Sequence, residues 1–162
     1  MGPSTGWRKT ISGLLGIFAD EQDKAVETLS RLYCAESQHS RQIAHHAERM
    51  QYPQFRDKLR AIAADEDKHA RWMAEKIRAL GGTVPAVPGT ATSDKNSWEY
   101  LVDDLEDQRR CAAELLVDIT RLQGDFPEVA DMLQRVYDEG SRHREELRSM
   151  LMRSDPQAHL AA

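Results

Sequence analysis

The sequence predicts an all-α fold, a bundle of four long helices preceded by a short amphipathic helix. Aromatic residues make up only 6% of the 162 residues and charged residues 30%, a composition that favours helices over a β-sandwich or barrel. Apolar residues also recur every three or four positions along four long segments. A chain of this length suits one domain with a sizeable core.

Residues 1–20 are predicted to form an N-terminal amphipathic segment. Its apolar positions follow helical spacing and are Trp7, Ile11, Leu14, Leu15 and Phe18. We expect the segment to pack against the bundle or a second subunit, and docking to a membrane surface or a larger partner is the alternative. No apolar run in the chain is long enough to span a bilayer.

The bundle is predicted over residues 21–153, beginning with helices at about 21–50 and 54–80. Gln51-Tyr52-Pro53 forms a tight connection between them, and Gly81-Gly82 ends the second helix. The apolar stripe of the first helix is interrupted by Glu36. That of the second is interrupted by Glu66 and His69, so both helices carry polar groups at mid-core.

Residues 81–93 form a linker too long for a simple helical hairpin. Helices of about 28 residues are about 42 Å long, and about 13 extended residues span a similar length. The linker can therefore cross the whole bundle, which predicts two helical hairpins joined by one long crossover.

The second hairpin is predicted at about 96–123 and 127–152. Its first helix is expected to be capped by Ser93 or Asp94, and Gly124-Asp125-Phe126-Pro127 makes the turn. Residues 154–162 are expected to form a flexible tail.

Composition also excludes several classes of site. A formal charge of -5 with interleaved acidic and basic residues provides no basic face for nucleic acid. Cys34 and Cys111 are single and widely separated, so neither a thiolate zinc site nor a rubredoxin-type iron site can be built. They are expected to be ordinary buried thiols in a protein of the reducing cytoplasm.

Glu36, Glu66 and His69 are the candidate site. A buried carboxylate that lacks a partner costs several kcal/mol, so a core glutamate is usually protonated, paired or metal-bound. Carboxylates together with imidazole suit iron or manganese. The alternatives are a buried salt bridge to Arg109 and a core histidine that is hydrogen-bonded to Glu66 or to a backbone carbonyl. The other histidines, at the edge of the stripe or on the surface, are His39, His45, His46 and His159.

At these residues the chain resembles the ferritin-like superfamily, particularly its bacterioferritin and rubrerythrin branch, over about residues 21–153. In that family a first-helix glutamate precedes Asp-Glu-x-x-His by about thirty residues, and Gly-Gly follows. The matching residues are Glu36, Asp65-Glu66-Asp67-Lys68-His69 and Gly81-Gly82. In the second hairpin they are Asp104-Leu105, Gly124-Asp125 and Asp138-Glu139-Gly140-Ser141-Arg142-His143.

The complete family site takes a glutamate from each of two helices and Glu-x-x-His from each of the other two. The second half departs from this pattern. Gln108 stands at the third-helix glutamate position, with Glu106 two residues away, and Gly140 stands three residues before His143. The resemblance implies Glu36 and Glu66 as bridging or terminal carboxylates and His69 as a terminal ligand. Glu139 and His143 would complete a second metal position.

The resemblance further implies one or two non-haem iron ions per chain, with manganese possible. The expected function is redox chemistry with oxygen or peroxide, of ferroxidase or peroxidase type, or iron handling. A metal-free helical bundle that acts as an interaction or scaffold module is the alternative, favoured by Gln108, Arg109 and Gly140. A homodimer or higher homo-oligomer is expected, because the N-terminal segment and the long helix faces offer surface to bury.

Overall fold

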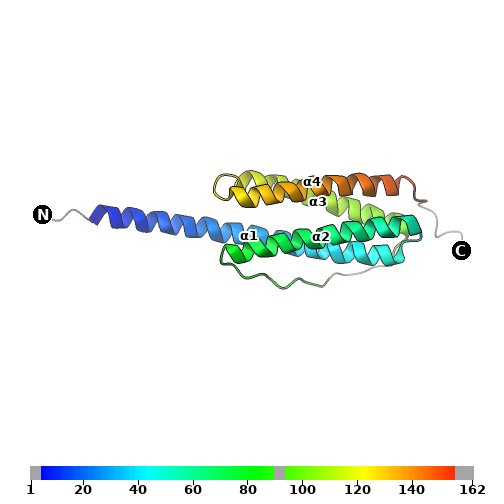
Figure 1. Ribbon diagram of the computed structural model, residues 1–162, viewed down its shortest axis with the longest axis horizontal. Coiled ribbons are helices and arrows are strands. Elements are labelled where there is room, and N and C mark those ends of the chain that lie inside the picture. Colours follow the sequence, from blue (N-terminus) through cyan, green and yellow to red (C-terminus); the bar gives the residue numbers. More distant parts are fainter. Residues whose placement is uncertain (1–4, 90–93, 156–162) are drawn as a thin grey trace.

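The computed structural model describes the backbone of residues 5–89 and 94–155, with side chains described from residue 18 onward. It consists of four helices (Figure 1): α1 (Thr5–Arg49), α2 (Pro53–Ala79), α3 (Ser97–Leu122) and α4 (Pro127–Leu151). The described residues contain no strand. The predicted all-α bundle is confirmed, whereas most of the predicted tail, residues 156–162, lies outside the described part.

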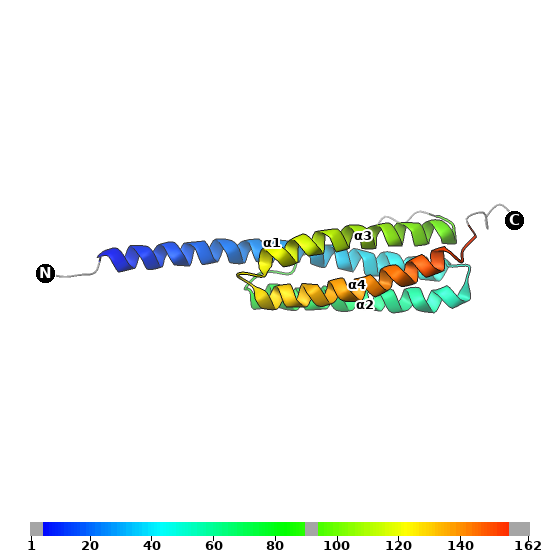
Figure 2. The ribbon, with the colours of Figure 1, turned by 90° about the horizontal axis from the view of Figure 1, so that it is seen from above.

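The helices form two antiparallel hairpins, α1 with α2 and α3 with α4 (Figures 1 and 2). The hairpins pack side by side, so that α1 lies against α3 and α2 lies against α4. Across the described diagonal α2–α3, side chains meet at the centre, where Gln108 reaches Glu66. Between them, the chain leaves α2 at one end of the bundle and enters α3 at the other. The long crossover predicted from the linker is therefore present, and each helix is antiparallel to both of its neighbours.

The predicted N-terminal amphipathic helix and the first long helix form one continuous helix of 45 residues. No proline or glycine pair interrupts the sequence between Phe18 and Gln22, so nothing separates the two predicted elements. The N-terminal part of α1 extends beyond the ends of the other three helices (Figure 1).

Local sequence signals set the ends of the other helices. Pro53 and Pro127 open α2 and α4, where a missing N–H leaves no hydrogen bond unmade. The expected caps of α3 were Ser93, which lies outside the described residues, and Asp94. Instead Asn96 is the cap. Its side-chain oxygen accepts a hydrogen bond from the backbone N–H of Glu99, and the Glu99 carboxylate accepts one from the backbone N–H of Asn96. Asp94 lies too early for this reciprocal pair.

The core is divided into two apolar clusters. One contains Leu29, Leu32, Met73, Ile77 and Leu133. The other lies towards the opposite end of the bundle and contains Ile43, Phe55, Leu59, Leu101 and Leu147. Buried polar side chains from all four helices lie between the two clusters along the sequence of each helix. We call them the polar layer: Glu36, Glu66, His69, Gln108 and His143.

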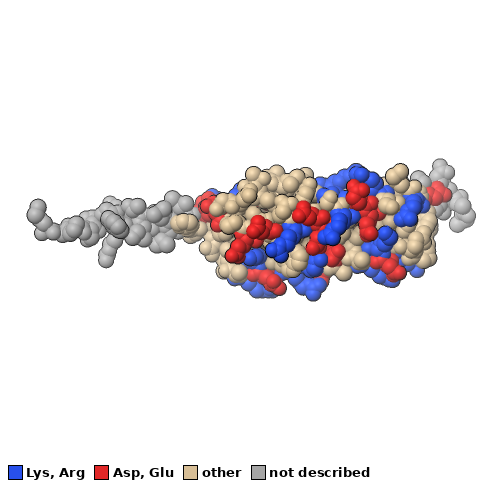
Figure 3. All heavy atoms as spheres, turned by 45° about the horizontal axis from the view of Figure 1, so that its top comes forward, with Lys and Arg blue, Asp and Glu red and all other residues tan. Residues whose placement is uncertain are grey.

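The surface carries charges of both signs. On the face shown in Figure 3, lysines and arginines alternate with aspartates and glutamates along the bundle. Within the described residues, no helix has an apolar stretch long enough to cross a membrane.

Candidate metal centre

The polar layer brings together three of the residues predicted to bind metal. Glu66 and His69 are three residues apart on α2 and therefore share one face of the helix. Glu36 faces them from α1, and all three are at most 2% exposed. One donor atom from each lies within 4.8 Å of the others, which is compact enough to hold a metal ion.

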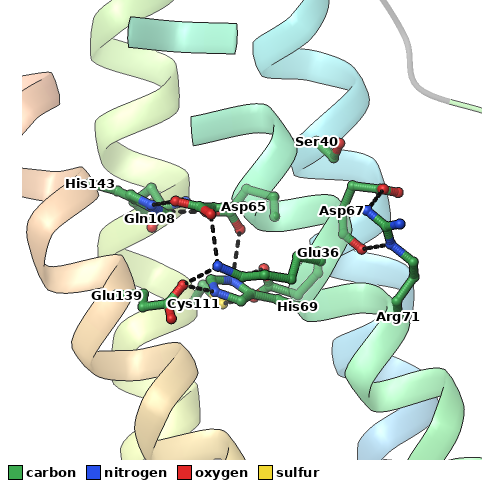
Figure 4. A network of polar contacts seen from close by, with 12 residues as sticks. Glu36, Ser40, Asp65, Asp67, His69, Arg71, Gln108, Cys111, Glu139 and His143 are labelled. Carbon is green, nitrogen blue, oxygen red and sulfur yellow. Dashed lines mark hydrogen bonds and ion pairs between the residues drawn. The ribbon is translucent and has the colours of Figure 1, made fainter. Parts of the chain in front are cut away.

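His69 is held so that its Nδ1 faces the two carboxylates. Its Nε2 lies 2.9 Å from Glu139 Oε2, and Lys68 Nζ lies 2.7 Å from the same oxygen (Figure 4). A carboxylate only accepts, so Nε2 carries the proton of this hydrogen bond, and in the neutral imidazole Nδ1 is left with a free lone pair. Such a carboxylate behind a histidine is the usual support of a metal-binding imidazole.

Two buried acceptor atoms then face one another without a donor between them. His69 Nδ1 lies 3.5 Å from Glu36 Oε2 and 4.0 Å from Glu66 Oε2. Neither His69 Nδ1 nor Glu36 Oε2 has a hydrogen-bond partner within the described residues. Buried polar atoms are normally paired, so either a metal ion or a proton held between these two atoms would satisfy both. The nitrogen and oxygen donors fit iron or manganese.

The other oxygen of Glu66 is already satisfied from the second hairpin. Oε1 accepts from Gln108 Nε2 at 2.8 Å and lies 2.9 Å from His143 Nδ1. His143 Nε2 lies 3.1 Å from Asp65 Oδ2, so each ring nitrogen faces a carboxylate. The second hairpin thus contributes an amide and an imidazole to the layer, and no carboxylate.

Burial and neighbouring charges shift the protonation of this group. Burial and the nearby Glu36 carboxylate together raise the pKa of Glu66 from 4.5 to about 7. Burial would lower the pKa of His143, but the hydrogen bonds and charges of Glu66 and Asp65 outweigh it and raise that pKa. For Glu139, burial is opposed by Lys68 and His69, which lower its pKa.

The remaining predicted site residues occupy different places. Glu139 and His143 lie next to the compact group, where they contact His69 and Glu66 respectively. Glu106 and Arg109 are exposed on α3, so neither the alternative glutamate nor the salt bridge to Arg109 forms. The helix is rotated so that Gln108 points inward instead.

His46 differs from the expectation of a surface or boundary residue. It is buried at 6% exposure, and its Nδ1 lies 2.8 Å from Asp104 Oδ1. Its ring stacks on Tyr100 with centroids 4.2 Å apart. The pair joins α1 to α3 outside the candidate metal centre, and position along the apolar stripe could not reveal it because Asp104 comes from another helix.

The sequence interpretation also missed the contact of Cys111 with the layer. Its thiol donates to Glu36 Oε1 at 3.3 Å, and burial raises the pKa of this thiol, which keeps it protonated. Cys111 lies one helical turn after Gln108, and this spacing was the available signal. Cys111 and Gly140 also border a small cavity of about 10 Å³ beside the three candidate ligands.

Comparison with known proteins agrees with the fold described above. The family model described as a ferritin-like domain matches residues 27–154. The comparison with curated proteins finds no match. Among solved structures, a ferritin-like diiron-carboxylate protein from Bacillus anthracis str. Ames superposes with a TM-score of 0.74. The two chains are 20% identical, and the match covers 80% of this chain and 96% of the other, which shows a shared fold.

Proposed function

Because the chain belongs to the ferritin-like domain family, we propose that it is a non-haem iron protein in which Glu36, Glu66 and His69 hold one metal ion. The observation that carries this proposal is the pair of buried acceptors without a donor, His69 Nδ1 and Glu36 Oε2. Iron held by such donors would exchange single electrons with oxygen or peroxide. If the ion is released again, the site would serve to bind iron reversibly.

The neighbouring side chains prepare this site. Glu139, held by Lys68, keeps the proton of His69 on Nε2 and aims Nδ1 at the carboxylates. Gln108 and His143 orient Glu66 through Oε1, which leaves Oε2 directed towards His69. We infer one metal ion per chain, because Gln108 replaces the carboxylate that would complete a second position and Gly140 supplies none.

Metal loading tests this proposal. Purified protein is loaded with ferrous iron without oxygen, assayed for bound iron, and then exposed to oxygen while near-ultraviolet absorbance is followed. We expect about one iron per chain, because the three donors form a single compact group. Glu36→Gln, Glu66→Ala and His69→Gln should each lower the iron content at least about tenfold.

Matched controls come from the second buried polar pair. Asp104→Asn and His46→Gln alter a carboxylate and an imidazole that are as buried but lie outside the candidate ligands. These variants should keep their iron. A wild-type protein that binds no more iron than Glu66→Ala would contradict the proposal.

A metal-free structural role is the alternative function. The observation that favours it is the pair of hydrogen bonds that Gln108 and His143 already make to Glu66. In that case a proton shared between Glu36 and His69 would replace the cation, and the loading experiment would find no specific iron.

We also propose that the chain forms a homodimer or a higher homo-oligomer. The N-terminal part of α1 extends beyond the bundle (Figure 1), and Phe18 on it is 64% exposed. Sedimentation equilibrium of the full chain, compared with Phe18→Asp, tests this. A monomer in both would contradict it.

A further inference from the structure

Gly140 leaves one side of the candidate metal centre without a protein ligand. A Cβ atom built there would meet Arg144 Nη1 at 3.4 Å and Gln108 Oε1 at 3.5 Å, so the residue faces the polar layer and its neighbours. The cavity bordered by Gly140 also touches Glu36, Glu66 and His69. A metal held by only these three protein donors would keep coordination positions open, and the cavity bordered by Gly140 is the space beside those donors.

Arg144 supplies positive charge at this open side. Its half-buried side chain borders the same cavity, and it makes no ion pair or hydrogen bond within the residues the structure describes. Its guanidinium instead lies 5.3 Å from the centre of the Tyr137 ring. An arginine without a carboxylate partner beside a metal centre is suited to bind an anion.

Gln108 adds no donor at the same place, so Arg144 is the side chain that would hold an anion there. Because Gln108 Nε2 donates to Glu66, its Oε1 is the atom directed towards Gly140. The cavity volume of about 10 Å³ is about the smallest that admits one water molecule, so only a ligand with a single heavy atom fits without movement of Arg144.

We propose that the position opened by Gly140 binds one small anion, coordinated by the metal and held by Arg144. This inference rests on the proposed function, because the anion needs the metal as its other partner. The ligand class is a small anion: one with a single heavy atom, such as hydroxide, fits the cavity as it stands, and one with about three, such as azide, fits once Arg144 moves outward. In this site it would stand where the ferritin-like resemblance places a protein carboxylate.

Cobalt(II) as the probe metal and azide as the probe anion test the proposal. Azide should change the visible absorption of the cobalt-loaded wild type with a saturable dependence on concentration. Arg144→Ala should weaken azide binding about tenfold and leave cobalt affinity unchanged, since it removes one charge-assisted contact to the anion. Arg148→Ala is the matched control: this exposed arginine lies one turn later and pairs with Glu145. It should leave both affinities unchanged.

Gly140→Glu provides a second, opposite test. The Cβ contacts at this position are ordinary, so a glutamate can be accommodated if Arg144 moves outward. The introduced carboxylate should tighten cobalt binding about tenfold and abolish the spectral effect of azide. Circular dichroism establishes that each variant is folded.

The outcomes separate the two proposals. If the wild type binds neither cobalt nor, in the loading experiment, iron, the proposed function is overturned and the anion site with it. Cobalt binding with equal azide affinity in the wild type and Arg144→Ala overturns the anion site alone. A change in cobalt affinity without a change in azide affinity also overturns it, because Arg144 would then only balance the charge of Glu36 and Glu66.

Discussion

Glu66 links the two halves of the polar layer, because one of its oxygens faces Glu36 and His69 and the other is bound by the second hairpin. Its carboxyl must lose its proton to bind a metal. With the pKa of Glu66 raised to about 7, metal affinity should rise with pH up to about that value. A proton would thus compete with the proposed metal for this residue.

The same pKa predicts how the stability of the metal-free protein depends on pH. Folding raises the pKa of Glu66 from 4.5 to about 7, so the folded state binds more protons than the unfolded chain in this range. The free energy of unfolding should therefore fall as pH rises from about 4.5 to 7, by roughly 3 kcal/mol. The raised pKa of His143 acts in the same direction from 6.5 upward.

Chemical denaturation of the metal-free protein between pH 5 and pH 8 (roughly the window in which this group titrates) measures the effect. Glu66→Gln should flatten the dependence, whereas Glu106→Gln, an exposed glutamate, should preserve it. If the free energy of unfolding of Glu66→Gln depends on pH as steeply as that of the wild type, other groups control this dependence. Asp65 and Glu139, with lowered pKa values, act oppositely and lose their stabilising effect only as pH falls further.

Residue patterns predicted only part of the candidate site. Glu36, Glu66 and His69 were predictable because each interrupts an apolar stripe whose neighbours are buried. Cys111 was indicated only by its spacing of one turn from Gln108, and Arg144 by no pattern, because their contacts depend on how the helices rotate and on side-chain direction across helices. Which of Glu106, Gln108 and Arg109 faces inward was undecided for the same reason.

At the scale of elements, the helices were predicted to within a few residues from apolar spacing, prolines and the Gly-Gly pair. The exception is the start of α1, where two predicted helices are one. Periodicity cannot separate two helices that continue without a break, since only a breaking residue marks a boundary. The cap of α3 was missed because several capping residues occur in sequence and only Asn96 has a glutamate three positions later.

The end of α2 gives a prediction at this scale. Gly81 has a φ of 75°, and a Cβ on Gly82 would lie 2.6 Å from Val26 Cγ1 and 3.0 Å from Ile77 Cγ2. Gly82→Ala should therefore lower the free energy of unfolding by about 1–3 kcal/mol, because α1 and α2 must separate to admit the methyl group. Gly124→Ala, with no described atom within 4 Å of its Cβ, should change it by less than about 0.5 kcal/mol. Thermal unfolding of both variants makes the comparison, and equal effects would refute the close-packing argument.

At the scale of the whole molecule, the metal would join the two helices of the first hairpin between the apolar clusters. Binding to the folded state alone should raise the free energy of unfolding by about 2.7 kcal/mol at a metal concentration 100 times Kd. Differential scanning calorimetry with ferrous iron, under argon and against a chelator, measures this shift. The Glu36→Gln variant should fold, but ferrous iron should not raise its free energy of unfolding. The same shift in that variant would place the metal elsewhere.

The division of the core also constrains how the hairpins can align. Two long helical hairpins with uniform apolar faces could slide past one another by one turn, about 5.4 Å, and still bury similar surface. Here such a slip would move Glu66 away from Gln108 and His143 and leave ionisable groups against leucines. Each stranded charge costs several kcal/mol, on the order of 3–5. The polar layer therefore fixes the register of the two hairpins, selecting one alignment among otherwise similar packings whether or not a metal is bound.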